Sequence, residues 1–198
     1  EHMNVIIDPN NPDLKVGKHI NDYRIERVES LKEISSVFYE LKHAGTGAKH
    51  IHISNSDAEN TFGVAFKTVP QDSTGVAHIL EHTVLCGSKQ YPVRDPFFSM
   101  LKRSLSTFMN AFTASDWTMY PFSTQNPKDF YNLMGVYLDA AFFPRLEELS
   151  FKQEGHRLET ENQPEGSDPD AHQLTYKGVD YNEMKGAMSS PDQVTVRS

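Results

Sequence analysis

Apolar and polar residues alternate over three short segments near the start of the chain. Alternation with a period of two is typical of strands that bury one face, and it occurs at 38–41, 50–54 and 60–66. A polar turn at 55–59 separates the second segment from the third. We therefore expect these segments to form an antiparallel meander.

Helical spacing replaces this alternation further along the chain. The clearest helix follows Asn126, a capping residue, with Pro127 at its first position and apolar residues at every third or fourth position before Pro144. The other expected elements are helices at 75–86 and about 95–107, a two-part strand at 108–121, short strands at 156–161 and 173–179 around a polar loop at 162–170, and a last helix from about Tyr181.

Strands that alternate with helices on one side predict an α+β fold, with an antiparallel sheet in one layer and helices on one face of it. We interpret residues 1–22 as an N-terminal extension, with His2 and Met3 as a tag remnant, and residues 23–198 as one domain. Neither a helix stop nor a closing strand precedes Ser198, so we expect this domain to be incomplete at its C-terminus.

The composition is that of a globular chain, and it disfavours several kinds of partner. With 198 residues and 37% hydrophobic content, the chain can bury a core. A formal net charge of −8 argues against nucleic acid or an anionic membrane as the main partner. No apolar run reaches the roughly 18 residues of a membrane-spanning helix. The single cysteine, Cys86, excludes an intramolecular disulfide.

Nine histidines are the unusual feature, because imidazole is the commonest metal ligand in proteins. The helix expected at 75–86, for which Asp72, Ser73 and Thr74 are N-cap candidates, contains the segment His78-Ile79-Leu80-Glu81-His82. On a helix, Glu81 and His82 lie at roughly −60° and +40° from His78, so all three project from one arc.

Two imidazoles one turn apart suit zinc, and a carboxylate on the same arc can act as general base toward water. H-x-x-E-H is the signature of the inverzincins. The simpler alternative makes His78 and His82 hydrogen-bonded core residues, with Glu81 paired to one of them. Burying three ionisable groups on an apolar helix without a metal would be costly, so we predict a zinc site with His78 and His82 as ligands and Glu81 as the catalytic base.

A catalytic zinc site takes three protein ligands and leaves one position for water. Four downstream carboxylates are candidates for the third ligand: Glu154, Glu159, Glu161 and Glu183. Spacing does not choose among them, and each one is by default a surface glutamate.

Several motifs occur in a fixed order along the chain. The longest is GVAHILEHTVLCGS at 75–88, and others lie at 91–93, 95–97, 106–113, 120–122, 137–140, 143–144, 153–157 and 181–186. In these segments the chain resembles the pitrilysin-type inverzincins, and within them the presequence protease branch. The resemblance covers nearly all of the chain from about Tyr23 to Ser190.

The resemblance implies the N-terminal catalytic domain of a zinc endopeptidase that hydrolyses short or unfolded peptides, such as presequences, with zinc-activated water. It implies one zinc ion per chain with Glu183 as the third ligand, and it makes Glu154 a carboxylate that orients a ligand or the water. Glu154 is also the runner-up as ligand. The strand with Asn110, Ala111 and Phe112 is implied to be the edge on which a substrate peptide lies.

Family members are much longer proteins, in which a second half supplies an arginine and a tyrosine to the substrate. We therefore expect this chain alone to bind zinc but to show weak or no peptidase activity. The resemblance implies a cytoplasmic location in bacteria and a mitochondrial or plastid location in eukaryotes. A non-catalytic scaffold relative of the processing peptidases is the competing interpretation, although such relatives lose the metal motif that is intact here.

Overall fold

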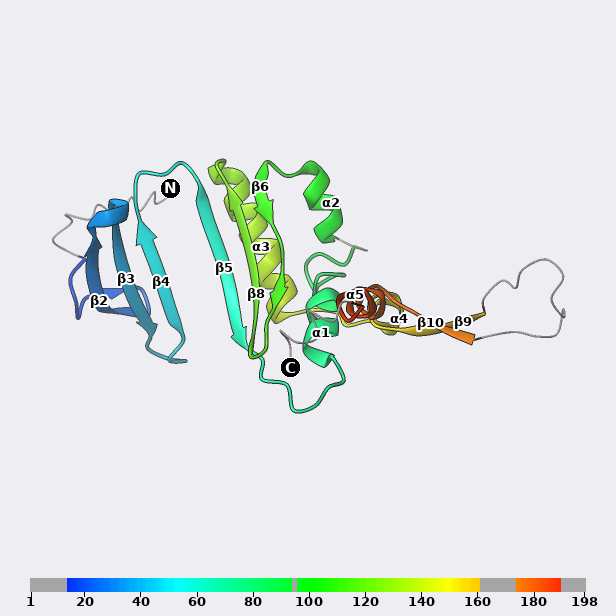
Figure 1. Cartoon of the computed structure of the whole chain (residues 1–198). Helices are drawn as coiled ribbons and strands as arrows, with labels where there is room; N and C mark the ends of the chain where they lie inside the picture. Colours follow the sequence, from blue (N-terminus) through cyan, green and yellow to red (C-terminus); the bar gives the residue numbers. More distant parts are fainter. Residues whose placement is uncertain (1–13, 94–95, 161–173, 190–198) are drawn as a thin grey trace, which may run out of the picture. The chain divides into compact units, whose positions relative to one another are not determined.

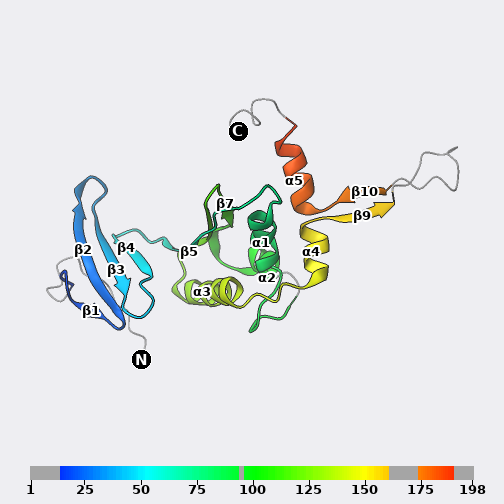
Figure 2. The same ribbon diagram turned by 90° about the horizontal axis from the view of Figure 1, so that it is seen from below.

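The computed structural model describes residues 14–93, 96–160 and 174–189. Contacts divide the chain into two compact units, one up to Ala58 and one from Glu59 onward. Figure 1 labels most of their elements, and Figure 2 adds the labels of β1 and β7. The tag remnant expected at His2 and Met3, the polar loop expected at 162–170 and the chain end at Ser198 lie outside the described residues.

The first unit is an antiparallel sheet in the order β1-β2-β3-β4. Its strands are β1 (His19–Ile20), β2 (Tyr23–Leu31), β3 (Ser36–His43) and β4 (Lys49–Ser54), with a 3-10 turn at Lys32–Ile34. Ile25, Tyr39 and Leu41 form its core, against which Leu14 and Ile20 pack. The described part of the expected N-terminal extension therefore packs with this sheet, and the domain boundary at 22/23 stays a prediction.

The second unit is built on an antiparallel sheet with β8 (Trp117–Thr124) at its centre. Strand β5 (Asn60–Lys67) pairs with β8 along its whole length. Strands β6 (Ser106–Met109) and β7 (Phe112–Thr113) also pair with β8. The last strand of the expected meander thus belongs to this second sheet, because its partner comes from far downstream in the chain.

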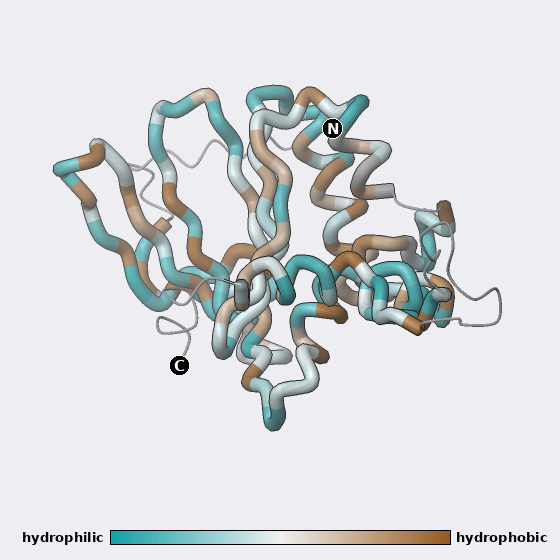
Figure 3. The backbone as a smooth tube through the Cα atoms, turned by 45° about the vertical axis from the view of Figure 1, so that its right-hand side comes forward, coloured by the Kyte–Doolittle hydropathy of each residue, from teal (hydrophilic) through white to brown (hydrophobic). Residues whose placement is uncertain are grey.

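Helix α3 (Pro127–Phe142) packs against β5 and β8. Its start is as predicted, since Asn126 accepts hydrogen bonds from the backbone N–H groups of Lys128 and Asp129, each at 3.0 Å. Leu133, Val136, Tyr137 and Ala140 are buried at helical spacing. Tyr120 and Phe122 of β8 complete this core with Val84 and Met109. Figure 3 shows the alternation of apolar and polar positions along the strands that gives the sheets their buried faces.

The remaining elements of the second unit are smaller. They are α1 (Val76–Val84), α2 (Pro96–Arg103), α4 (Glu148–Glu154), the antiparallel hairpin of β9 (Arg157–Thr160) and β10 (Leu174–Lys177), and α5 (Val179–Ala187). The α+β fold class with antiparallel sheets is confirmed. Helix α4 was not predicted, because its short sequence of mixed character carries no helical period long enough to recognise.

Helix α1 begins later than its expected caps. Gly75 is the N-cap in the left-handed region at φ 74°, where glycine carries no steric penalty. Asp72 instead accepts a hydrogen bond from the N–H of Thr74 in the preceding turn. Val76 and Leu80 are exposed, so the helix is buried along one side only. None of the described helices combines the length and apolar character needed to cross a bilayer.

Acidification is expected to destabilise the first unit. His52 of β4 contacts the ring of Tyr39, with centroids 6.1 Å apart. Burial lowers the pKa of His52 from 6.5, and the charge of His50 lowers it further. The unfolded chain therefore binds this proton more readily than the folded chain, so stability that is present above pH 6.5 is lost as the pH falls through the folded-state pKa.

The measurement is amide hydrogen exchange in β3 and β4 as the pH is lowered, corrected for the intrinsic exchange rate. The free energy of opening should fall with pH in the unmodified chain and depend less on pH in His52→Gln. An equal pH dependence in the two chains would show that another group is responsible.

Candidate metal centre

Helix α1 presents two imidazoles one turn apart. The rings of His78 and His82 have centroids 4.9 Å apart and planes at 88°. Their side chains are 22% and 18% exposed, so both rings are largely withdrawn from water but remain accessible. The spacing in the sequence is enough to bring them together, because residues four apart lie on one face of a helix.

Helix α5 brings a carboxylate to the same place. Glu183 Oε1 lies 3.8 Å from His78 Nε2, and Glu183 Oε2 lies 3.6 Å from His82 Nε2. One ligand atom from each of the three residues lies within 4.8 Å of the other two. Glu183 is 57% exposed, so this side of the group faces solvent.

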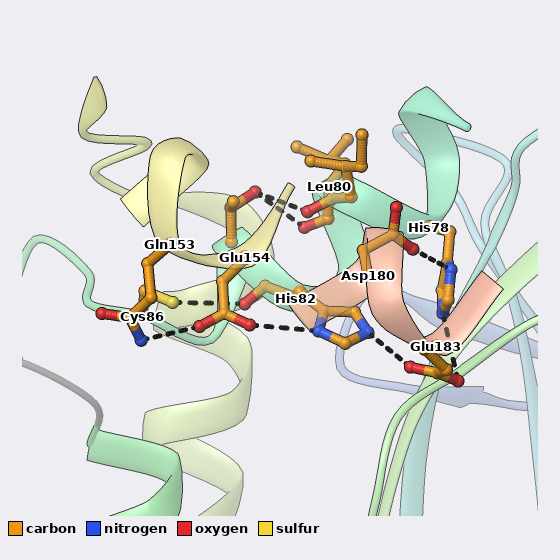
Figure 4. A network of polar contacts seen from close by, with 10 residues as sticks. His78, Leu80, His82, Cys86, Gln153, Glu154, Asp180 and Glu183 are labelled. Atoms are coloured by element: carbon orange, nitrogen blue, oxygen red, sulfur yellow. Dashed lines mark hydrogen bonds and ion pairs between the residues drawn. The ribbon is translucent and has the colours of Figure 1, made fainter. Parts of the chain in front are cut away.

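Two further carboxylates hold the opposite sides of the imidazoles. Nδ1 of His82 is 3.2 Å from Glu154 Oε2, and Nδ1 of His78 forms an ion pair with Asp180. Glu154 and Asp180 are only 5% and 6% exposed. Figure 4 shows the resulting row, which runs from Glu154 through His82, Glu183 and His78 to Asp180. A Nδ1–H donated to a carboxylate leaves the lone pair on Nε2, which is the usual arrangement of metal-binding histidines.

The carboxylates also set the proton affinity of the site. The hydrogen bond with Glu154 raises the pKa of His82 despite its burial, and the charges of Glu81, Glu154 and Glu183 add to this effect. The same hydrogen bond lowers the pKa of Glu154, although burial opposes it. A cation that binds Nε2 of His82 must therefore displace a firmly held proton at low pH.

Glu81, the expected base, is 8% exposed. Its Oε2 accepts a hydrogen bond of 2.7 Å from the hydroxyl of Thr113 on β7. Thr113 lies 3.4 Å from the hydroxyl of Thr118, which in turn bonds to Thr68 at 2.8 Å. Burial and the charge of Glu81 both raise the pKa of Tyr120. The sheet thus fixes the orientation of Glu81 from one side.

The residues expected to bind a substrate lie at the sheet edge rather than in the histidine group. Asn110 and Ala111 connect β6 to β7, and the side-chain oxygen of Asn110 accepts a hydrogen bond from the N–H of Ala111. The N–H of Asn110 bonds to the carbonyl of Pro121. Phe112 opens β7 and is 42% exposed. Their role in substrate binding stays a prediction.

Sequence reasoning missed Asp180 and Thr113. Asp180 could have been found, because it lies three residues before Glu183 and therefore on the same face of a helix. Thr113 lies in the 106–113 motif, but the sequence assigns it no role, since only strand pairing brings it to Glu81. Of the other candidate ligands, Glu159 pairs with Arg157 at 2.6 Å, and Glu161 lies outside the described residues.

The sequence profile of the insulinase family, peptidase family M16, matches residues 68–178. This chain belongs to peptidase family M16. The match includes α1 and the hairpin but stops before α5.

Curated M16 relatives are similar over most of this chain. The chain is 57% identical over 178 residues to a mitochondrial presequence protease of Xenopus tropicalis, covering 90% of this chain and 17% of the relative. For the mitochondrial presequence proteases of Mus musculus and Saccharomyces cerevisiae, the identities are 56% and 53%, over 91% and 88% of this chain. The chain spans about 17% of the length of these relatives.

A solved structure shares the fold. The crystal structure of pitrilysin matches with a TM-score of 0.56 and 21% sequence identity, over 68% of this chain and 14% of the pitrilysin chain. At this identity the likeness concerns the fold alone. It agrees with the M16 assignment made from the sequence profile.

Removing the charge that holds His78 should weaken metal binding. We expect Asp180→Asn to bind zinc about 10- to 100-fold more weakly, because carboxylates that orient a metal-binding histidine typically contribute that much to affinity. Competition with a chromogenic chelator measures the zinc Kd. Glu148→Gln is the matched control, since Glu148 lies on α4 with a side chain that is 79% exposed. Equal zinc affinity in Asp180→Asn and this control would contradict the role of Asp180.

Proposed function

We propose that this chain is the zinc-binding part of an M16 metallopeptidase, with His78, His82 and Glu183 as the zinc ligands. The observation that carries the proposal is the convergence of two Nε2 atoms on Glu183 while both Nδ1 atoms are held by carboxylates. The M16 profile match and the presequence protease relatives support the peptidase activity.

The spacing of the donor atoms fits zinc. Two ligands at about 2.1 Å from one tetrahedral ion lie about 3.4 Å apart. The Nε2 to carboxylate distances of 3.8 and 3.6 Å are longer than hydrogen bonds but close to this separation. Nitrogen and oxygen donors from three residues are also the set expected of a catalytic zinc site.

Zinc bound at these ligands would polarise a peptide carbonyl and lower the pKa of water. Glu81 is the general base in this proposal. It takes a proton from the attacking water and delivers it to the leaving amine. Thr113 holds Oε2 of Glu81, which leaves Oε1 to carry the proton. Glu154 and Asp180 keep the imidazoles oriented through the turnover.

The proposed substrates are short or unfolded peptides of the presequence type. The names of the relatives support this substrate class. Among the described strands, β6 and β7 form the edge of the sheet beside β8, and an extended peptide can bind such an edge through main-chain hydrogen bonds. Asn110, Ala111 and Phe112 lie along this edge. For a eukaryotic source we propose a mitochondrial location, in line with the names of these relatives.

The chain should bind one zinc ion. Elemental analysis of the purified chain after zinc has been offered and excess removed should give about one zinc per chain. His78→Ala and Glu183→Ala should each lose it, because each removes one of three ligands. Glu81→Gln should retain it, because Glu81 is not a ligand. Less than about a tenth of an equivalent in the unmodified chain would favour the scaffold interpretation over a zinc enzyme.

Catalysis should depend on Glu81 and on the rest of the protein. In a full-length protein that contains this chain, we expect Glu81→Gln to lower kcat by about 10²- to 10⁴-fold, the usual contribution of a general base. A quenched-peptide assay measures this effect, with zinc content checked on the same samples. The 198-residue chain alone should show weak or no activity, because substrate positioning and exclusion of water need the remaining domains. Full activity of Glu81→Gln with bound zinc would exclude Glu81 as the base.

A further inference from the structure

The β9–β10 hairpin connects the two carboxylates that hold the imidazoles. At the base of the hairpin, Arg157 of β9 pairs with Lys177 of β10. Glu154 lies three residues before Arg157, and Asp180 lies three residues after Lys177. Figures 1 and 2 show the hairpin projecting from the position where α4 and α5 meet its base. The Arg157–Lys177 pair therefore brings together two chain segments that each lie three residues from a carboxylate of the site.

The base of the hairpin is tightly packed. A side chain on Gly178 would overlap the backbone of Gly155. The backbone of Gly178 is extended at φ 167°, so its requirement for glycine is one of space rather than of dihedral angle. A side chain on Gly155 would in turn meet Ile79 of α1, with its Cβ 3.2 Å from Cγ2. The hairpin base is thus packed closely against the C-terminal end of α4 and against α1.

A row of aromatic rings crosses this base. Phe151 of α4 contacts His156, with ring centroids 5.4 Å apart. His156 contacts Tyr176 of β10 at 6.0 Å, and Tyr176 contacts Tyr181 of α5 at 5.8 Å. These edge and tilted contacts are the geometries that aromatic pairs prefer. The row ties α4 to α5 through the hairpin without using any of the charged residues of the site.

We propose that the hairpin base positions the metal centre by fixing the separation of Glu154 and Asp180. The proposal rests on the zinc site proposed above. A flexible connection between α4 and α5 would leave this separation free to vary, and the two imidazoles would lose their fixed Nδ1 partners. Gly178 and Tyr176 are then positioning residues, which act on His82 and His78 through Glu154 and Asp180.

The first test is Gly178→Ala, with Gly186→Ala on α5, the helix that follows Gly178, as the matched control. A side chain on Gly186 would meet nothing within 4 Å. In the metal-free chain, proton NMR should show downfield Nδ1–H signals from His78 and His82 that are protected by their carboxylates. We expect Gly178→Ala to weaken or lose them and Gly186→Ala to keep them. Zinc affinity, measured by chelator competition, should fall about tenfold or more in Gly178→Ala only.

A second pair of variants separates positioning from folding. Tyr176→Phe keeps the ring and should keep both the NMR signals and the zinc affinity, whereas Tyr176→Leu should lose both while circular dichroism shows a folded chain. Unchanged Nδ1–H signals and zinc affinity in Gly178→Ala and Tyr176→Leu would overturn the positioning role. An unmodified chain with protected Nδ1–H signals but no zinc binding would instead refute the proposed zinc site, so the two failures are distinguishable.

Discussion

The contact between an imidazole Nδ1 and a buried carboxylate is the interaction on which the candidate site depends. It occurs twice, between His82 and Glu154 and between His78 and Asp180. Each contact fixes the rotation of a ring that would otherwise turn freely on a helix surface. The two Nε2 atoms are thereby directed at Glu183. The carboxylates come from α4 and α5, and the imidazoles come from α1. The candidate site therefore forms only if these three helices keep fixed positions relative to one another.

The charges of the site call for a cation. Glu81, Glu154 and Asp180 are all buried, and Glu183 adds a further carboxylate to the two imidazoles. Neutral imidazoles leave this group strongly negative, and buried charges are costly unless they are paired or coordinate a metal. The hydrogen bond with Glu154 and the neighbouring carboxylates accordingly raise the pKa of His82. A divalent ion bound on the Nε2 side would offset the negative charge of the carboxylates while the imidazole rings stay neutral.

The fold divides the tasks of the site among its elements. The sheet holds Glu81 through Thr113, and its β6 and β7 edge is the proposed binding site for a substrate peptide. Helices α1 and α5 supply the expected zinc ligands, and α4 supplies the carboxylate that orients His82. The presequence protease relatives are about six times as long as the part that this chain matches.

The sequence by itself determined whatever depends on neighbours along the chain. Helix α3 follows from the capping by Asn126 and the apolar spacing after it, and the grouping of His78, Glu81 and His82 follows from the period of one helix. Tertiary structure alone decided which strand pairs with β5 and where Thr113 meets Glu81. It also paired Glu154 with His82, where the resemblance had left open which group Glu154 orients, and it paired Asp180 with His78. Spacing left four glutamates open as the third ligand, and the family resemblance selected Glu183 among them. The physical reason is that periodicity fixes contacts within an element, whereas contacts between elements distant in sequence are set by the packing of the whole unit.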